Sequence, residues 1–301
     1  MTKQAKNSII PSFMKQLGAN SFFSIPDFPL VCMRQERHAA TELHTHDFHE
    51  LVVILGGRGM HLMDGHYYPI EAGDVFLIRG DMAHGYAETN AMALVNILFE
   101  PQRLRLPLAG LADVPGYHAL FRVEPQLRQA DQFRRRLRLL PQALDEVALM
   151  IEKLEAELEG GALGYRFVSV ALLMELIGFL ARNYFAAVRR EQRPLRKLSE
   201  VMSYIEAHYA EPITIADLTR IAGASESTLT RQFHKVVGRS PIEHVLRVRV
   251  ERAAGLIRRS DLRITEIAYE CGFSDGNYLA RQFVRIMGVS PSEYRRQNRT
   301  G

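Results

Sequence analysis

The apolar positions in the last third of this chain form one pattern that occurs twice. In each copy an apolar side chain recurs at positions i, i+4 and i+7, first at Leu229, Phe233 and Val236 and then at Leu279, Phe283 and Ile286. This spacing places the apolar side chains on one face of a half-buried helix. Because the copies lie about 50 residues apart, the pattern predicts a repeated helical module.

The residues before each apolar stripe predict a helix-turn-helix. A short apolar-periodic segment comes first, at residues 216–222 and again at 265–271, and Thr214 is a plausible N-cap for the first of them. Gly223 and Gly272 then stand where this helix has to end, since glycine adopts the left-handed conformation at little cost.

Capping residues mark the start of the helices that follow. Ser225 and Ser274 are suited to cap the second helix of each copy. The string Ser240-Pro241-Ile242-Glu243 combines a capping box with proline at the first helical position. It predicts a long helix over residues 241–259 that joins the two modules.

The charge distribution agrees with a nucleic-acid partner. From Leu195 onward the chain carries 17 Lys and Arg against 12 Asp and Glu, a net of +5, whereas the whole chain carries +4. The positive excess therefore lies in the repeated half, as phosphate binding requires. A pair of helical hairpins that merely pack is the alternative, but Arg231 and Arg281 occupy the same place in the two second helices. A helix-turn-helix inserts that helix into the major groove, and two modules are expected to read grooves about 34 Å apart.

The first half of the chain has a different rhythm. Over residues 31–100, short apolar runs alternate with Gly-Gly and Asp-Gly turn signals, which predicts a small β-barrel or sandwich. Within it, His44, His46 and Glu50 share strand parity, so an extended segment would present them on one side.

Three interpretations of these side chains remain open. With His84 they could hold Fe, Mn, Ni or Zn, which gives a metal set of His44, His46, Glu50 and His84. They could instead line a metal-free effector pocket, or their hydrogen bonds could close the barrel mouth. Asn96 is either a satisfied core residue or a partner for a ligand hydroxyl. The candidate pocket residues are His44, His46, Glu50, His84, Tyr86 and Asn96.

Two helices are predicted after the β region. The first carries a narrow heptad seam made of Leu144, Val147, Ile151, Leu154 and Leu158. The second, after Gly160-Gly161, is apolar on several faces and is expected to be widely buried. The first helix could pair with its twin in a homodimer, or both helices could simply cover the barrel.

The remaining segments are less regular. Residues 101–125 contain four prolines and are expected to form a loop. The arginine-rich run 134–138 is interpreted as the solvated face of a helix, with a second phosphate-binding patch as the alternative. Residues 1–30 read as an irregular arm and residues 189–194 as a linker.

Composition and segment lengths indicate a cytoplasmic protein. Apolar residues make up 47% and charged residues 24%, as in globular proteins. Cys32 and Cys271 lie in different predicted domains, so a disulfide framework is not expected. Residues 1–10 lack the apolar core of a signal peptide, and the most apolar run, 167–181, is too short to span a membrane.

Residues 213–299 resemble the DNA-binding domain of AraC/XylS-type transcription regulators. The two modules carry the resemblance, together with the string from Ile264 to Asp275, Tyr278 and the string from Ser290 to Arg295. It implies base-facing positions at Ser227, Thr230, Arg231, Gly276, Asn277, Ala280 and Arg281. Arginine can bond guanine and asparagine can bond adenine in a bidentate way. Phosphate contacts, which set register, are expected from Lys235, Arg239 and Arg285.

The β region resembles the cupin barrel. The first cupin motif, His-x-His, three residues, Glu, six residues and Gly, is met in full between His44 and Gly57. The second departs from the pattern, with Arg79 and Asp81 in place of Pro and Gly and with Glu88 in place of Asn. The barrels of AraC/XylS-type regulators usually bind an effector without metal, so the resemblance favours a metal-free pocket and no cofactor.

A narrower similarity is to the L-rhamnose-responsive regulators of this family. It rests on residues 46–51, 84–86, Asn96, 108–111 and 115–117. It implies a sugar effector, most simply L-rhamnose or another monosaccharide. Family membership also implies a homodimer that binds promoter DNA and acts on RNA polymerase.

The sequence therefore predicts an α+β protein of two domains. Residues 1–190 are expected to form a cupin-like barrel with a helical pair, for effector binding and dimerisation, and residues 195–301 an all-α domain with two helix-turn-helix modules. The favoured function is a sugar-responsive, DNA-binding transcriptional activator, not an enzyme. The alternative is a metal-dependent cupin enzyme, such as a dioxygenase or sugar isomerase, fused to a DNA-binding domain.

Overall fold

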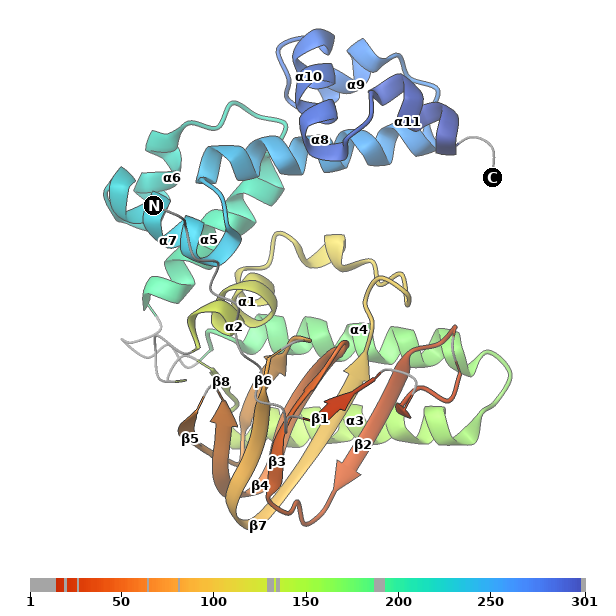
Figure 1. Ribbon diagram of the computed structural model, residues 1–301, viewed down its shortest axis with the longest axis vertical. Coiled ribbons are helices and arrows are strands. Elements are labelled where there is room, and N and C mark those ends of the chain that lie inside the picture. Colours follow the sequence, from red (N-terminus) through yellow and green to blue (C-terminus); the bar gives the residue numbers. More distant parts are fainter. Residues whose placement is uncertain are drawn as a thin grey trace, which may run out of the picture. The chain divides into compact units, whose positions relative to one another are not determined.

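The chain folds into two compact units (Figure 1). The computed structural model describes residues 15–18, 21–25, 27–63, 65–80, 82–128, 133, 136–186 and 193–298. One unit comprises Met1–Pro107 with Arg128–Ala187, and the other comprises Leu108–Leu127 with Val188–Gly301. The predicted α+β fold, with a mostly-β N-terminal part and a helical C-terminal part, is confirmed. Its division at residues 1–190 and 195–301 differs from these units in the segment 108–127 and at the boundary, where residues 188–190 belong to the second unit.

Among the residues that the structure describes, the first unit is built on one eight-stranded sheet. Its strand order is β1-β3-β7-β4-β6-β8, with β2 also paired to β7 and β5 also paired to β4. All strand pairs among the described residues are antiparallel except β1 with β3. The strands are β1 Lys15–Leu17, β2 Leu30–Gln35, β3 Thr41–His46, β4 His49–Met63, β5 His66–Glu71, β6 Asp74–Ile78, β7 His84–Phe99 and β8 Leu137–Arg138.

Both faces of the central strands are buried. Val52 and Ile54 on β4 point into the interior cluster, whereas Leu51 and Val53 point the other way and are equally inaccessible. Helices α3 (Pro141–Gly160) and α4 (Tyr165–Asn183) pack against each other and cover that other face (Figure 1). The central seam residues of α3 have at most 1% exposure, so the seam covers the sheet and is not free to pair with a twin.

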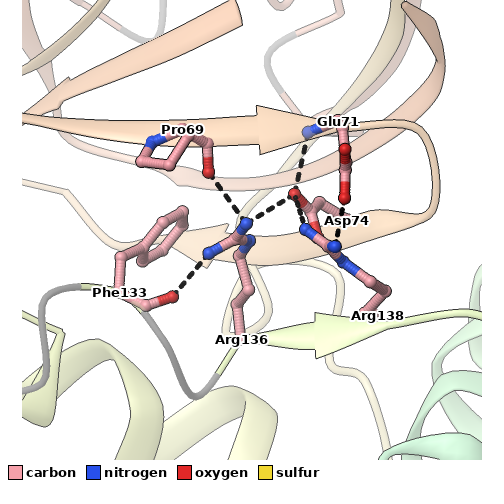
Figure 2. A network of polar contacts seen from close by, with 6 residues as sticks. All are labelled: Pro69, Glu71, Asp74, Phe133, Arg136 and Arg138. Atoms are coloured by element: carbon pink, nitrogen blue, oxygen red, sulfur yellow. Dashed lines mark hydrogen bonds and ion pairs between the residues drawn. The ribbon is translucent and has the colours of Figure 1, made fainter. Parts of the chain in front are cut away.

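An ion-pair network fastens the last strand of the sheet (Figure 2). Asp74 is fully buried and accepts hydrogen bonds from the Glu71 N–H, from Arg136 Nη2 at 2.8 Å and from Arg138 Nε at 2.8 Å. Arg136 also donates to the Phe133 carbonyl. The interpretation of residues 134–138 as a solvated helix face is therefore wrong for the described residues 136–138. A buried carboxylate holds Arg138 on β8 and Arg136 directly before it.

The expected loop at residues 101–125 is only partly a loop. After turns at 101–105, the chain forms η2 (Leu108–Leu111), α1 (Pro115–His118), η3 (Ala119–Val123) and α2 (Glu124–Leu127). Prolines 115 and 125 misled the prediction, because proline is compatible with the first turn of a helix and with a widened turn.

The second unit contains seven further helices among its described residues. They are α5 (Arg193–His208), α6 (Ile215–Ala222), α7 (Glu226–Val237), α8 (Pro241–Arg259), α9 (Ile264–Glu270), α10 (Gly276–Met287) and α11 (Pro291–Asn298). The long helix α8 has the predicted bounds and contacts α6 and α7 of the first module and α9, α10 and α11 of the second. The repeated helix-turn-helix prediction is confirmed.

Caps account for most helix boundaries in this unit. Thr214 and Ser240 form capping boxes with Asp217 and Glu243, and Ser225 caps α7. The expected cap at Ser274 is wrong, since Asp275 caps α10 through a 2.7 Å hydrogen bond from the Tyr278 N–H. Both residue types are good caps.

Gly272 is required by the packing of the second module. It adopts a φ of +76°, and a Cβ there would lie 2.7 Å from the Ala210 carbonyl oxygen. The backbone after α5 therefore approaches the turn after α9 too closely for any side chain. This contact fixes the second module against the end of α5.

Some predictions concern residues that the structure does not describe. The linker at 189–192 and most of the N-terminal arm lie outside the described residues. Pro194 stands in the first turn of α5. Cys32 and Cys271 are both free thiols. Among the helices that the structure describes, none combines the length and the apolar character needed to cross a membrane.

Candidate effector pocket and DNA-reading helices

A cavity of about 380 Å³ lies in the first unit. Its apolar side is formed by Leu17, Phe22, Met33, Leu43, Phe48 and Leu98, and its polar side by Gln35, His38, Thr41, Glu42, His44, His46, Glu50, Tyr86 and Asn96. Five of the six predicted pocket residues thus line the cavity. The sixth, His84, lies behind them against Glu50.

Three of the predicted residues meet in a buried cluster. The Nε2 atoms of His46 and His84 lie 2.9 Å and 3.2 Å from the same oxygen of Glu50, and all three side chains are almost inaccessible. The expectation that His46 and Glu50 share one extended strand is wrong, because the chain turns between β3 and β4. The turn brings the two side chains together, and β7 supplies His84.

The Nδ1 contacts of His46 and His84 show which ring nitrogen carries a proton. His46 Nδ1 lies 3.0 Å from the Phe48 carbonyl oxygen, and His84 Nδ1 lies 2.9 Å from that of Met82. A carbonyl oxygen only accepts, so each Nδ1 carries a proton. A neutral ring would then turn a lone pair toward the Glu50 carboxylate. The cluster therefore calls for additional positive charge, either protons on Nε2 or a cation.

The ligand atoms of the cluster suit a divalent metal ion. One atom from each of His46, Glu50 and His84 lies within 4.8 Å of the others. Imidazole held by a backbone carbonyl at its second nitrogen is the usual arrangement of metal-bound histidine. His44, the fourth member of the predicted metal set, is not in this group. Its ring packs 4.3 Å from that of His84, and its Nδ1 lies 3.0 Å from the Glu42 carbonyl.

Buried polar atoms of the cavity lack partners. Tyr86 Oη, Asn96 Oδ1 and His38 Nε2 make no hydrogen bond to any part of the chain that the structure describes. Burial raises the pKa of Tyr86 well above its usual value, so its hydroxyl remains a donor. Unpaired buried polar groups cost free energy, and a ligand that bonds them would recover it. Asn96 is therefore not the satisfied core residue that was the alternative.

Sequence reasoning missed two histidines. His38 follows β2 and packs edge-on against Tyr86 at 4.7 Å. His61 on β4 is fully buried beside Tyr86, and neither of its ring nitrogens has a partner among the described residues. Burial lowers the pKa of both rings. Each is a lone histidine with no motif around it, so nothing in the sequence singled it out.

The residues expected to face DNA bases lie on the open sides of two equivalent helices. On α7, Ser227 and Arg231 are exposed, whereas Leu229 and Phe233 are buried. On α10, Asn277 and Arg281 are exposed, and the Arg281 guanidinium lies over the Tyr278 ring at 5.6 Å. Thr230 and Ala280 are half-buried on the same sides of their helices. The predicted readers are thus presented outward.

Gly276 and the phosphate candidates complete this set. A Cβ at Gly276 would lie 3.0 Å from a Thr265 methyl group, so the residue allows close packing of α10 on α9. Lys235 and Arg285 are exposed near the ends of α7 and α10. Arg239 is half-buried in the turn between α7 and α8.

Comparisons with known proteins match both halves of the chain. Residues 30–177 match the model of the AraC-like ligand binding domain, and residues 218–297 match a helix-turn-helix domain. A solved structure of the DNA-binding domain of AdpA in complex with a target DNA is 32% identical, covers 35% of this chain and 94% of that chain, and has a TM-score of 0.34.

Two curated relatives extend over most of the chain. The HTH-type transcriptional activator RhaS of Escherichia fergusonii is 30% identical over 94% of this chain and 97% of that protein. The HTH-type transcriptional activator RhaR of Escherichia coli K12 is 31% identical over 85% of this chain and 87% of that protein. The chain therefore belongs to the AraC family of DNA-binding transcriptional regulators.

Proposed function

We propose that this regulator is a cytoplasmic activator controlled by a neutral sugar that binds in the cavity of the first unit. The observation that carries the proposal is that three residues lining that cavity have buried polar atoms without a partner among the described residues, namely Tyr86 Oη, Asn96 Oδ1 and His38 Nε2. They offer both donors and acceptors, as a sugar hydroxyl requires, since a hydroxyl both donates and accepts. L-rhamnose is the first candidate, because the relatives RhaS and RhaR and the sequence similarity of the pocket motifs point to it.

Charge in the cavity favours a neutral ligand. None of the described lining residues is Lys or Arg, whereas Glu42 and Glu50 contribute carboxylates. Burial lowers the pKa of His44, and its neighbour His84 lowers it further, so this ring does not supply a fixed positive charge at neutral pH. A sugar acid or sugar phosphate would meet the Glu42 carboxylate and would find no Lys or Arg among the described lining residues to pair with. The apolar side of the cavity suits the C–H faces of a sugar ring.

The second unit is proposed to bind promoter DNA through both modules. Ser227, Thr230 and Arg231 on α7 and Gly276, Asn277, Ala280 and Arg281 on α10 are the proposed base-facing residues. Lys235, Arg239 and Arg285 are the proposed phosphate contacts. Their exposure on equivalent helices supports these roles. RNA polymerase is the proposed partner at the promoter.

A homodimer is proposed to form through α4 and not through the seam of α3. Leu163, just before α4, is fully exposed, and Phe167 on its first turn is 81% exposed. Val168 beside them is also accessible. Large apolar side chains exposed side by side are typical of a surface that a partner covers. A second copy of the chain would bury both copies of this surface at once.

Ligand-dependent melting of the purified chain tests the effector proposal. Neutral monosaccharides, with L-rhamnose first, are expected to raise the melting temperature, whereas matched sugar acids and sugar phosphates should not. Tyr86→Phe removes only the unpaired hydroxyl and should reduce the shift. Tyr67→Phe, at an exposed tyrosine of the same sheet, is the matched control. No shift with any neutral sugar, or an equal shift in Tyr86→Phe, would contradict the proposal.

A metal ion in the same pocket is a second candidate, favoured by the two Nε2 atoms that face Glu50. His46, Glu50 and His84 would hold the ion, which would supply the positive charge that the cluster calls for and a coordination position for an effector oxygen. Metal analysis of the protein purified without chelator tests this. Stoichiometric metal that is lost in His46→Ala but kept in His208→Ala would support it. Metal-free protein that still binds the sugar would exclude it.

A further inference from the structure

The connection between β7 and β8 is far longer than its ends require. It leaves the sheet after Phe99 and returns at Leu137. Connections within a compact domain usually take about 2–6 residues. Here the middle of the connection, Leu108–Leu127, belongs to the second unit, although both of its ends belong to the first.

The middle of this connection, residues 108–127, here called the excursion, is a helical element and not a surface loop. Helices α1, η3 and α2 follow one another without a break from Pro115 to Leu127. Every residue from Gly116 to Pro125 is buried except Arg122. The wide π-turn η3 directly precedes α2, where Pro125 has no N–H to donate and would crowd the carbonyl four residues earlier in an ordinary α-helix.

This element packs on the first helix-turn-helix module. Helix α1 contacts α5, η3 contacts both α5 and α7, and α2 contacts α7, which is the proposed reading helix. The segment also contains a buried polar contact of its own. Buried His118 is held through its Nε2 atom, which lies 2.6 Å from the Ala112 carbonyl oxygen. Leu120 is completely inaccessible.

Both ends of this connection lie on strands of the first unit's sheet, and the first of these strands, β7, lines the pocket. β7 carries His84, Tyr86 and Asn96 and ends where the connection begins. At the other end, Arg138 on β8 is held by the buried carboxylate of Asp74 (Figure 2). The chain thus provides a covalent path from β7 to the element that contacts α5 and α7.

We propose that residues 108–127 form the coupling element through which the effector pocket controls the first helix-turn-helix module. The inference rests on the proposed sugar-dependent function. Its physical basis is that the element is covalently part of the effector domain and structurally part of the DNA-binding unit. A ligand that binds more tightly to one position of β7 thereby favours one position of α5 and α7. Allostery requires such a difference in the affinity of the ligand for two states of the protein.

Loosening the two joints of the excursion in the full-length chain tests the proposal. A short Gly-Ser insertion between Leu106 and Pro107, combined with one at residues 129–132, lengthens the path without changing the pocket or the reading helices. The same insertion at exposed Gly65, in the turn between β4 and β5, is the control. The measured quantity is the ratio of the affinity for a selected DNA duplex with and without L-rhamnose.

We expect the unmodified chain and the Gly65 control to show a ratio in the range of about 5- to 150-fold that is typical of coupled sites. In the joint variant the ratio should fall toward one, while its affinity for L-rhamnose and for DNA alone stays within about twofold of the unmodified chain. A joint variant that keeps the full ratio overturns the proposal. An unmodified chain without any ratio instead contradicts the sugar-dependent function itself, and the coupling element falls with it.

A second measurement does not depend on how the insertions fold. In the unmodified chain, L-rhamnose should change amide hydrogen exchange at residues 115–127 and in α5, none of which line the cavity. If L-rhamnose changes hydrogen exchange in β7 but leaves it unchanged at residues 115–127 and in α5, the proposal is overturned.

Discussion

His46 and Glu50 stand on opposite sides of a turn, and the Nε2 atom of His46 lies 2.9 Å from the Glu50 carboxylate. Because the second ring nitrogen of His46 donates to the Phe48 carbonyl, the imidazole and the carboxylate attract each other only if a proton or a cation lies between them. The attraction between these two pocket residues therefore depends on the charge of the cluster.

Replacing Glu50 by glutamine should destabilise the first unit at neutral pH. Burial raises the pKa of Glu50, but hydrogen bonds from His46 and His84 outweigh it and hold the pKa well below its usual value. A lowered folded-state pKa contributes stability above the unfolded pKa of about 4.5 that is lost as the pH falls through the folded value. Glu50→Gln should therefore cost about 2 kcal/mol at pH 7 by thermal or urea unfolding. The cost should shrink in acid, and Glu42→Gln, at an exposed carboxylate, should have little effect.

Alanine at Arg231 or Arg281 should weaken binding to a duplex selected by the wild-type protein by about 1–3 kcal/mol each, because a bidentate base contact is lost. Binding to random duplex should change far less. Fluorescence anisotropy on both duplexes checks this, and equal losses on the two would contradict base reading.

Alanine at Lys235 should act differently, because a phosphate contact carries no sequence information. Affinity for selected and random duplexes should fall together, and the slope of log affinity against log salt should decrease by about 0.9. A salt titration of both duplexes measures it. A loss confined to the selected sequence would show that Lys235 contacts a base.

Asp74→Asn should destabilise the first unit by about 3 kcal/mol or more, since removing one partner of a buried ion pair leaves charge without compensation. Arg136 and Arg138 both lose their shared buried carboxylate (Figure 2). Urea unfolding followed by circular dichroism measures the loss, with Asp145→Asn, at an exposed position of α3, as control. A change within the error of that control would show that the network contributes little.

The second unit should lose stability in mild acid through His118. Burial is the main cause that lowers the pKa of this histidine to about 4; the Ala112 carbonyl opposes this shift, and the neighbouring Arg122 adds to it. The unfolded chain, with a pKa of about 6.5, binds the proton first, so the contribution is full above pH 6.5 and is lost as the pH falls toward 4. Between pH 7.5 and pH 5 the loss should be about 2 kcal/mol. Hydrogen exchange in α5 at the two pH values measures it, and His118→Asn should flatten the dependence.

The helix-turn-helix modules were largely predictable because their signals are local. Thr214, Ser240 and the glycines that end α6 and α7 act within a few residues of where they stand, so their spacing gave the boundaries of α6 to α8. The one wrong cap shows the limit. Ser274 and Asp275 are adjacent and both suitable, and only the packing of the turn decides which of them faces the helix.

The effector pocket was predictable in its residues but not in its geometry. The motif from His44 to Gly57 pointed to the correct side chains, yet its strand parity suggested one extended segment where the chain turns. His38 and His61 contact Tyr86 from distant positions in the sequence, and a local sequence pattern does not predict such contacts. The unpaired atoms that support a sugar ligand are a property of the assembled interior.

By itself the sequence determined the two kinds of secondary structure, the repeated modules and the residue types available for binding, because hydrophobic periodicity, caps and turn residues act over short distances. Only the tertiary structure decided that the seam of α3 covers the sheet, that Asp74 pairs with Arg136 and Arg138, and that residues 108–127 pack with α5 and α7. These outcomes depend on contacts between residues far apart along the chain. They follow from which surfaces are buried together, and a linear pattern does not contain that information.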